Sequence, residues 1–332
     1  MIRLPYLVLF SLCVFTFADK SLAQNQLVSF SPNIIDNTAQ AAQNEKFRVT
    51  NATTRIWLEN GSTRWSHCMS ARCGGDSIYG DLTSKLEYDK LQQYSSELEI
   101  TRPITQYSFL LARAQVGFVN DGTLRDRDYY NTGLSFRDTL SDIKTGNWIS
   151  TGIYGGFWGN KEAVEYQIYT GLNIAREELK AYGIRCQTPE TGSDVCQALS
   201  SDIRVIRNHI TWYEPAVGVS AKTMISDKLN ALMDFEFSPY AYFSGEDSHY
   251  SDSNLNGDVS FKMTGHGRAL TTKLGLSYQL SERMNLEAIM RNQRRWAKDQ
   301  TIARSPNFDA KYPLRTLESE RTGIAIGVTI KL

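Results

Sequence analysis

The sequence predicts an all-β protein, a ten-stranded antiparallel transmembrane β-barrel with long extracellular loops. Three observations lead to this fold class. Apolar and polar residues alternate along several segments, short polar turns recur at intervals, and aromatic residues are plentiful (17 Tyr, 14 Phe, 6 Trp) while Pro is scarce (8 of 332 residues). Mean hydropathy is −0.37, and after the N-terminus no apolar run approaches the length of a spanning helix. Strands are therefore expected to cross the membrane.

The alternation separates two faces in residues 215–224, 229–243, 270–280 and 324–332. In the last segment Ile324, Ile326 and Val328 share one face, and Gly327 and Lys331 lie on the other. A period of two is typical of strands. A soluble β-sandwich would show the same alternation, so the turns must decide between the two architectures.

Short polar turns are expected near Arg102–Pro103, Gly159–Asn160, Ser226–Lys228 and Ser281–Arg283. They lie roughly 55 to 65 residues apart, which is room for two long strands and one extended loop. Four short turns and five long loops make ten strands, with the turns periplasmic and the loops outside. The loops are expected near 58–83, 119–142, 182–205, 244–259 and 296–316. The chain ends in Leu332, whereas such barrels usually end in an aromatic residue.

The N-terminus predicts export. Met1–Arg3 is a short basic region, Leu4–Ala18 is apolar, and Ser21-Leu22-Ala23 supplies small residues at the −3 and −1 positions. Cleavage of a signal peptide (1–23) is expected after Ala23. Residues 24–332 then form one barrel in the cell outer membrane, with no separate domain.

Cysteine spacing agrees with an oxidising compartment. Cys13 leaves with the signal peptide, and the other four form two close pairs, Cys68 with Cys73 and Cys186 with Cys196. Local disulfides in two exterior loops are expected. A zinc site using His67 beside Cys68 is the alternative, but zinc-type CxxC spacing is missing, so no metal is expected.

The charge balance also limits the partners. The chain carries 36 basic and 36 acidic side chains. A nucleic-acid-binding protein would show a basic excess, so no nucleic-acid partner is expected. Ordinary apolar content without net charge also argues against a disordered chain.

Two clusters contain residues suited to chemistry. Asp247 and His249 are two residues apart in the fourth expected loop, so in extended structure the carboxylate can orient the imidazole as a general base. Asp126 and Asp128 have the same spacing in the second loop, and paired carboxylates can share a proton. Each has an ordinary alternative: a rim histidine, and a solvated or calcium-binding loop. The turn count places both clusters at the exterior end.

Together the clusters resemble the omptin family of outer-membrane endoproteases. Leu27–Asn33 looks like the omptin opening strand, and Ser84–Tyr88 resembles the family's S-x-L-[DE]-aromatic strand. The D-x-D-aromatic and D-x-H-Y motifs follow in the same order. The resemblance runs through most of the mature chain, except the Cys68–Cys73 insertion and the Cys186–Cys196 segment.

The resemblance implies a narrow barrel with an active-site groove at the extracellular rim. Asp247 would orient His249, and His249 would activate a water held against Asp126 and Asp128. It implies an aspartic-type endopeptidase that acts on polypeptides with no metal or nucleophilic side chain. A monomer is expected, with a dependence on lipopolysaccharide bound at the barrel's outer face.

The sequence departs from the omptin pattern in the specificity pocket. Thr54-Arg55 stands where omptins carry an acid before Arg, and Gly245 stands where they carry a second acid. Glu246 is adjacent, and Asp138 matches the family's acid for the residue after the cut. Because a bound cation needs a counter-charge, weak discrimination before the scissile bond and a basic preference after it are expected.

Two functions from other classes remain as alternatives. One is a catalytically silent barrel that serves as an adhesin or surface structure, although the four motif residues are all present. The other is a porin. Ten strands leave a lumen that side chains largely fill, and four inward residues are expected to form ion pairs across it: Asp234, Glu236, Lys273 and Arg291.

Overall fold

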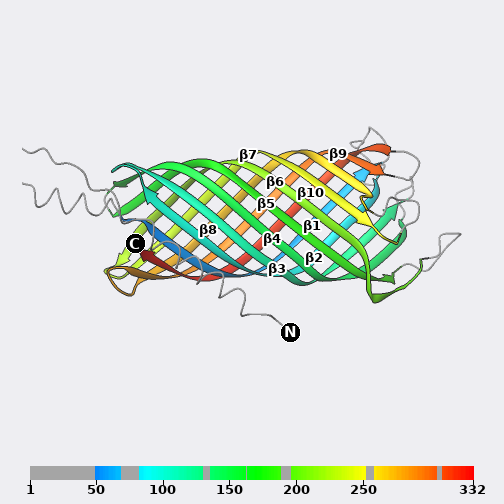
Figure 1. The fold of residues 1–332 in the computed structure, drawn as a ribbon, viewed down its shortest axis with the longest axis horizontal. Helices are drawn as coiled ribbons and strands as arrows, with labels where there is room; N and C mark the ends of the chain where they lie inside the picture. Colours follow the sequence, from blue (N-terminus) through cyan, green and yellow to red (C-terminus); the bar gives the residue numbers. More distant parts are fainter. Residues whose placement is uncertain are drawn as a thin grey trace, which may run out of the picture.

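The structure, a computed structural model, describes residues 49–68, 82–129, 135–161, 163–187, 196–251, 258–304 and 309–332. Within these ranges ten antiparallel strands form one closed barrel (Figure 1), which confirms the predicted fold class. The strands are β1 (Asn51–Cys68), β2 (Leu82–Pro103), β3 (Ser108–Tyr129), β4 (Ser135–Lys161), β5 (Val164–Cys186), β6 (Leu199–Ser226), β7 (Leu229–His249), β8 (Phe261–Gln279), β9 (Met284–Arg304) and β10 (Asp309–Lys331). No helix in these ranges is long and apolar enough to cross a membrane.

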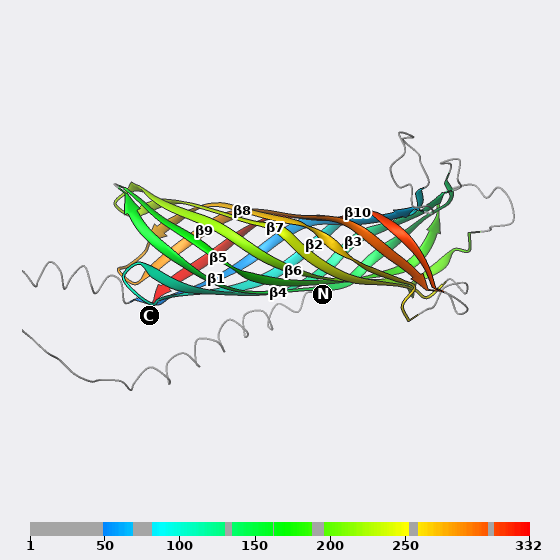
Figure 2. The ribbon, with the colours of Figure 1, turned by 90° about the horizontal axis from the view of Figure 1, so that it is seen from above.

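Each strand pairs with its sequence neighbours, and β1 pairs with β10 to close the ring, from Asn51↔Lys331 onward. Figures 1 and 2 show the resulting long barrel of tilted strands from two directions. From Asn51↔Lys331 to His67↔Leu314 this closure leaves no open strand edge, so the backbone groups there are satisfied without water. This is the condition for crossing a bilayer with strands.

The predicted turns are confirmed, but the predicted loops are too long. Successive strands end and begin at Pro103 and Ser108, Lys161 and Val164, Ser226 and Leu229, and Gln279 and Met284, close to the expected turns; we call this the short-turn end. At the opposite loop end the strands continue into every segment predicted as loop, so that β3 runs to Tyr129 and β7 to His249. The reason is that alternation and cross-strand pairing persist there, and paired backbone remains strand wherever it stands relative to the membrane.

An apolar belt marks the part of the barrel that spans the membrane. Large exposed apolar side chains lie on the half near the short turns; on β3 they end at Phe118 and on β7 at Tyr242. Towards the loop end only Ile203 and Tyr250 are comparably exposed within the described residues. The outer faces there carry charged pairs such as Arg127 with Glu87. The loop end therefore projects beyond the hydrocarbon region.

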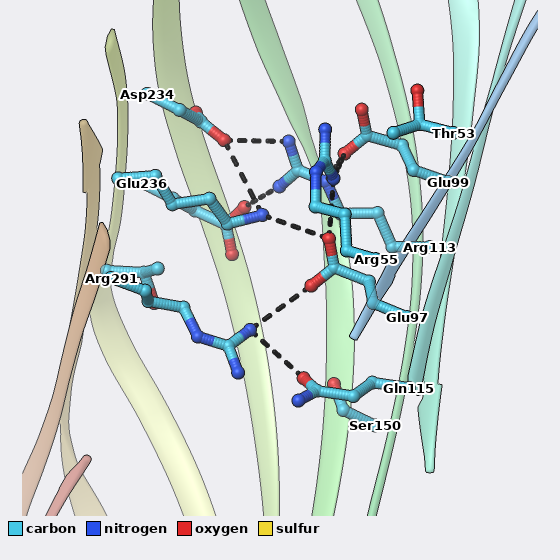
Figure 3. Close-up of polar contacts among 12 residues, drawn as sticks. Thr53, Arg55, Glu97, Glu99, Arg113, Gln115, Ser150, Asp234, Glu236 and Arg291 are labelled. Carbon is cyan, nitrogen blue, oxygen red and sulfur yellow. Dashed lines mark hydrogen bonds and ion pairs between the residues drawn. The ribbon is translucent and has the colours of Figure 1, made fainter. Parts of the chain in front are cut away.

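Ion pairs fill the lumen inside the belt (Figure 3). Arg113 contacts Glu99 at 2.7 Å, Asp234 at 2.9 Å and Glu236 at 2.7 Å. Arg291 reaches across to Glu97 at 3.2 Å. The four inward residues predicted from the sequence all join this network, Lys273 through Asp234 at 3.9 Å.

Two further layers frame the network. Towards the loop end lies a core of buried apolar side chains that includes Trp148, Leu179 and Trp212. Towards the short-turn end a cavity of about 540 Å³ opens, with Thr101 and Trp158 in its lining. The core layer, which also contains the buried ion pairs Arg295–Glu214 and Arg321–Glu177, lies between this network and the chemistry-bearing residues.

Candidate functional site

The four residues of the two motifs lie at the loop end, beyond the apolar belt. Asp126 and Asp128 are near the end of β3, and His249 is the last residue of β7. They stand on paired strands and not on loops, which corrects the predicted placement. Alternation turns each pair inward, since Asp126 is the partner of buried Leu86 and Asp247 that of buried Asn208.

Asp247 and His249 form a tight pair. The His249 Nε2 lies 2.7 Å from Asp247 Oδ2, and Asp247 is fully buried. Its other oxygen, Oδ1, accepts hydrogen bonds from Asn208 Nδ2 at 3.0 Å and from the Tyr88 hydroxyl at 3.3 Å. The His249 backbone N–H donates to Ser260 Oγ at 2.8 Å. His249 is thus held in place both through its backbone and through its ring.

Electrostatics favour the charged form of His249. Burial disfavours an imidazolium, but the Asp247 carboxylate outweighs burial, and Asp126 and Asp128 add to its effect. Together they raise the pKa of His249 to about 9. A histidine held in this way keeps its proton at neutral pH and so carries a positive charge at the mouth of the barrel.

The aspartate pair has a raised pKa of its own. Asp126 is 6% exposed, and burial followed by the nearby charge of Asp128 raises its pKa to about 7, against the opposing effect of His249 and Arg137. Asp128 is more open and lies 4.0 Å from Arg137. The pair can therefore hold one proton near neutrality.

The two clusters act on each other across the mouth. The carboxylates of β3 raise the pKa of His249 on β7, and His249 lowers the pKa of Asp126 in return. The structure thus brings together the four residues that the sequence pattern singled out.

Asp138 and Glu246, the two predicted substrate-binding acids, lie on the opposite face of the sheet. Asp138 is the partner of Arg127 and accepts a hydrogen bond from Arg125 Nε at 2.9 Å. Glu246 is the partner of His209 and precedes inward-facing Asp247. Because direct partners share a face and neighbours alternate, neither carboxylate points into the mouth.

The match of Thr54-Arg55 to the omptin specificity pair is wrong. Thr54 pairs with Leu98 and Val328 near the short-turn end, and Arg55 belongs to the lumen network. The first strand begins at Asn51, so this dipeptide starts the barrel and does not reach its mouth.

One predicted disulfide is confirmed. Cys186 and Cys196 are bonded, with their Cα atoms 6.0 Å apart. Cys68 is also disulfide-bonded. Its expected partner Cys73, the signal peptide (1–23) and the Leu27–Asn33 motif lie outside the described residues.

Three residues were not assigned to this site from the sequence, where His67 was considered only as a zinc ligand. Tyr88 and Asn208 bond Asp247, and His67 lies close enough to His249 for their charges to interact. Tyr88 is the aromatic residue of the Ser84–Tyr88 motif, and nothing else in the sequence pointed to a role for it at this site. No three His, Cys, Asp or Glu side chains in the described ranges are grouped to hold a metal ion.

Comparisons with known proteins agree with the barrel. A family model described as Pom, Protochlamydia outer membrane protein, matches residues 60–330. The outer membrane protease OmpT from Escherichia coli matches with a TM-score of 0.70 and 13% identity, covering 92% of this chain and 99% of OmpT. The translocator domain of the autotransporter NalP from Neisseria meningitidis has a TM-score of 0.39 and 10% identity, covering 89% and 96%. No curated protein matches the sequence.

These findings differ in what they establish. At 13% identity the likeness to OmpT shows the fold alone, an outer-membrane β-barrel. The family model extends from β1 into the end of β10 and thus covers most of the chain. The chain therefore belongs to the Protochlamydia outer membrane protein family.

Proposed function

We propose that the protein is an outer-membrane endopeptidase of the omptin type, with its active site at the exterior mouth of the barrel. The observation that carries the proposal is the 2.7 Å pair of His249 and Asp247 facing Asp126 and Asp128 from opposite strands. Paired strands of a closed barrel hold all four groups, and fixed geometry is what general-base catalysis requires. The end that carries the longest connections, such as the one between β1 and β2, is taken to face outward, which puts this mouth outside the cell.

The proposed reaction is hydrolysis of a peptide bond by water. In the neutral form of His249, with Nε2–H donated to Asp247, the Nδ1 atom takes a proton from a water held against the aspartate pair. The water oxygen bonds to the scissile carbonyl carbon, and protonated Asp126 donates a hydrogen bond to the developing oxyanion. The imidazolium then gives its proton to the leaving amine as the C–N bond breaks.

Each supporting group has a distinct part in this scheme. Asp247 stabilises the imidazolium, while Tyr88 and Asn208 keep that carboxylate pointed at the ring. The similar Escherichia coli barrel, OmpT, is an outer membrane protease, but the proposal rests on the four residues of this chain. Lipopolysaccharide is proposed as a partner and no metal as a cofactor.

The test is hydrolysis of a peptide library by refolded protein, with and without lipopolysaccharide, read by mass spectrometry. His249→Ala is expected to abolish cleavage. His266→Ala is the matched control, because His266 also pairs with an aspartate, Asp299 at 3.6 Å, but on the exposed outer face. Cleavage that survives His249→Ala, or no cleavage by the wild type in either condition, would contradict the proposal. The second result would favour a silent barrel that acts as an adhesin or surface structure.

A further inference from the structure

Arg137 is a basic side chain on the inner face of the mouth, beside the aspartate pair. It is the direct cross-strand partner of Asp128, and direct partners share a face of the sheet. The guanidinium Nη1 lies 4.0 Å from Asp128 Oδ2, and its charge also acts on Asp126. The next residue, Asp138, faces outward because neighbours alternate. The register of β4 on β3 thus places a base at this point of the mouth, where the family match had led us to expect an acid.

Arg137 can reach a bound substrate, because its side chain is not packed into the core. It is 33% exposed, against 24% for the Asp128 side chain. Asp126 is only 6% exposed, and its Oδ1 atom is buried without a hydrogen-bond partner among the described residues. Only the other oxygen of Asp126 is therefore left to contact a substrate. The guanidinium, in contrast, presents several N–H donors in a planar fork, so it can interact with Asp128 and with a second oxygen at the same time.

The proposed reaction adds negative charge next to a carboxylate. In the reactive state Asp126 is protonated and His249 is neutral, while Asp128 is ionised. Attack by water places a negative charge on the carbonyl oxygen, and the positive charge that forms on His249 is paired with Asp247 at 2.7 Å. Ionised Asp128 repels the new charge on the oxygen. Arg137 is the cation that the structure places beside Asp128, and a guanidinium keeps its charge throughout the working pH range.

We propose that Arg137 is a catalytic residue: its guanidinium donates a hydrogen bond to the scissile carbonyl oxygen and stabilises the negative charge that forms there. The proposal rests on the proposed endopeptidase function and adds a second donor to the one that Asp126 supplies. A cation fixed in advance where charge develops lowers the barrier without the cost of reorganising water.

The electron and proton movements remain those of general-base hydrolysis. The water proton passes to His249 Nδ1, the water oxygen bonds to the carbonyl carbon, and the π-electron pair of the carbonyl moves onto the oxygen held by Arg137. When that pair re-forms the carbonyl, the C–N bond breaks and the leaving amine takes the proton from His249. Arg137 keeps its own protons at every step.

The test measures kcat and KM separately, on one peptide that the wild type cleaves. Arg137→Ala is expected to lower kcat about a hundredfold and to leave KM nearly unchanged, because the charge that it stabilises exists only in the transition state. Arg125→Ala is the matched control and should keep the wild-type kcat. Arg125 also pairs with an aspartate of β4, Asp138, but on the outer face of the same two strands.

Chemical rescue separates a catalytic guanidinium from a structural one. Guanidinium chloride at a non-denaturing millimolar concentration should restore part of the kcat of Arg137→Ala, and the same concentration of sodium chloride should not. Arg137→Lys keeps the charge without the planar fork, so its kcat should lie between those of the wild type and Arg137→Ala. The fold of each variant is checked by heat-modifiable migration on gels.

The outcomes distinguish the two proposals. A wild-type kcat in Arg137→Ala, a change in KM alone, or a loss of kcat that guanidinium does not relieve would overturn the role of Arg137 and leave the endopeptidase function standing. If Arg137→Ala does not fold, a wild-type kcat in Arg137→Lys would overturn that role, and a reduced kcat at unchanged KM would support it. No cleavage of any peptide by the wild type would overturn the endopeptidase function, and the role of Arg137 with it.

Discussion

Two raised pKa values set the protonation of the site, about 7 for Asp126 and about 9 for His249. The proposed chemistry needs Asp126 protonated and His249 neutral. The fraction of molecules in that state is highest between the two pKa values, and it falls on either side as one group or the other changes charge.

We therefore predict a bell-shaped pH dependence of kcat/KM with its optimum between pH 7 and 9. Asp247→Asn removes the carboxylate that most strongly raises the pKa of His249, so the optimum should move to lower pH and the maximum rate should fall. Initial rates on one peptide across pH 5 to 10 test this. An unchanged optimum in Asp247→Asn would show that the His249 proton does not control the rate.

Asp126 is predicted to lower stability in exchange for activity. Its folded pKa lies above the ordinary 3.8, so ionisation disfavours folding, and the unfolding free energy falls as pH rises from about 4 to 7. Asp126→Asn should raise the unfolding free energy at pH 8 by at most about 4 kcal/mol, give little gain at pH 4, and reduce activity at least about a hundredfold. Denaturant unfolding in detergent at the two pH values measures this, and equal gains at both would contradict it.

Residue-level prediction succeeded where it needed only a period of two. The spacing of Asp126 with Asp128 and of Asp247 with His249 gave each pair a common face, which the structure confirms. It could not reveal Asn208, because Asn208 meets Asp247 only through the register of β6 on β7, and that register shifts between Tyr213 and Val217. Asp138 was misplaced because the family match ignored which face it occupies.

At the scale of elements, the strands extend well past the apolar belt. The sequence located the four short turns, since polar clusters interrupt the alternation there. It underestimated strand length at the other end, because charged outer faces such as that of residues 125–127 have the composition of a solvated loop. In the structure those charges form cross-strand pairs, for example Arg125 with Asp138, and the strand continues beneath them.

The Cys186–Cys196 disulfide ties the outer ends of β5 and β6, with 10 residues of sequence separation. Replacing both cysteines with serine is predicted to lower the unfolding free energy by about 3 kcal/mol, the loop-closure entropy for a loop of this length. Denaturant unfolding without reductant measures this. Adding reductant to the double variant then isolates the Cys68 disulfide, and an unchanged midpoint in the double variant without reductant would contradict the prediction.

At the scale of the whole molecule, ion-paired side chains close the lumen. The space left among Glu97, Arg113 and Arg291 is about 40 Å³, close to the volume of one or two water molecules. Each charge in such a buried network depends on its partner, and removal of one partner leaves the charge of the other buried and unpaired.

Arg291→Ala is predicted to lower the unfolding free energy by roughly 3 to 5 kcal/mol, because Glu59 and Glu97 lose a buried partner. Arg294→Ala is the control on the same strand, since Arg294 is exposed on the outer face. Equal effects of the two substitutions in denaturant unfolding would show that the lumen network contributes little.

The same closure predicts negligible ion conductance. In planar lipid bilayers the folded protein should leave the current at the level of the bare membrane, with heat-unfolded protein as control. Regular conductance steps would instead support the porin alternative.

The closed ring also limits how a substrate can be held. Many proteins capture an extended peptide by adding it as one more strand to an open sheet, which supplies binding energy from the peptide backbone regardless of sequence. Here each strand has two partners along the described pairings that close the ring, so the wall of the barrel has no position for an incoming strand. Along the wall, therefore, a polypeptide gains nothing by pairing its backbone, and it can be held only where it lies across the strand ends.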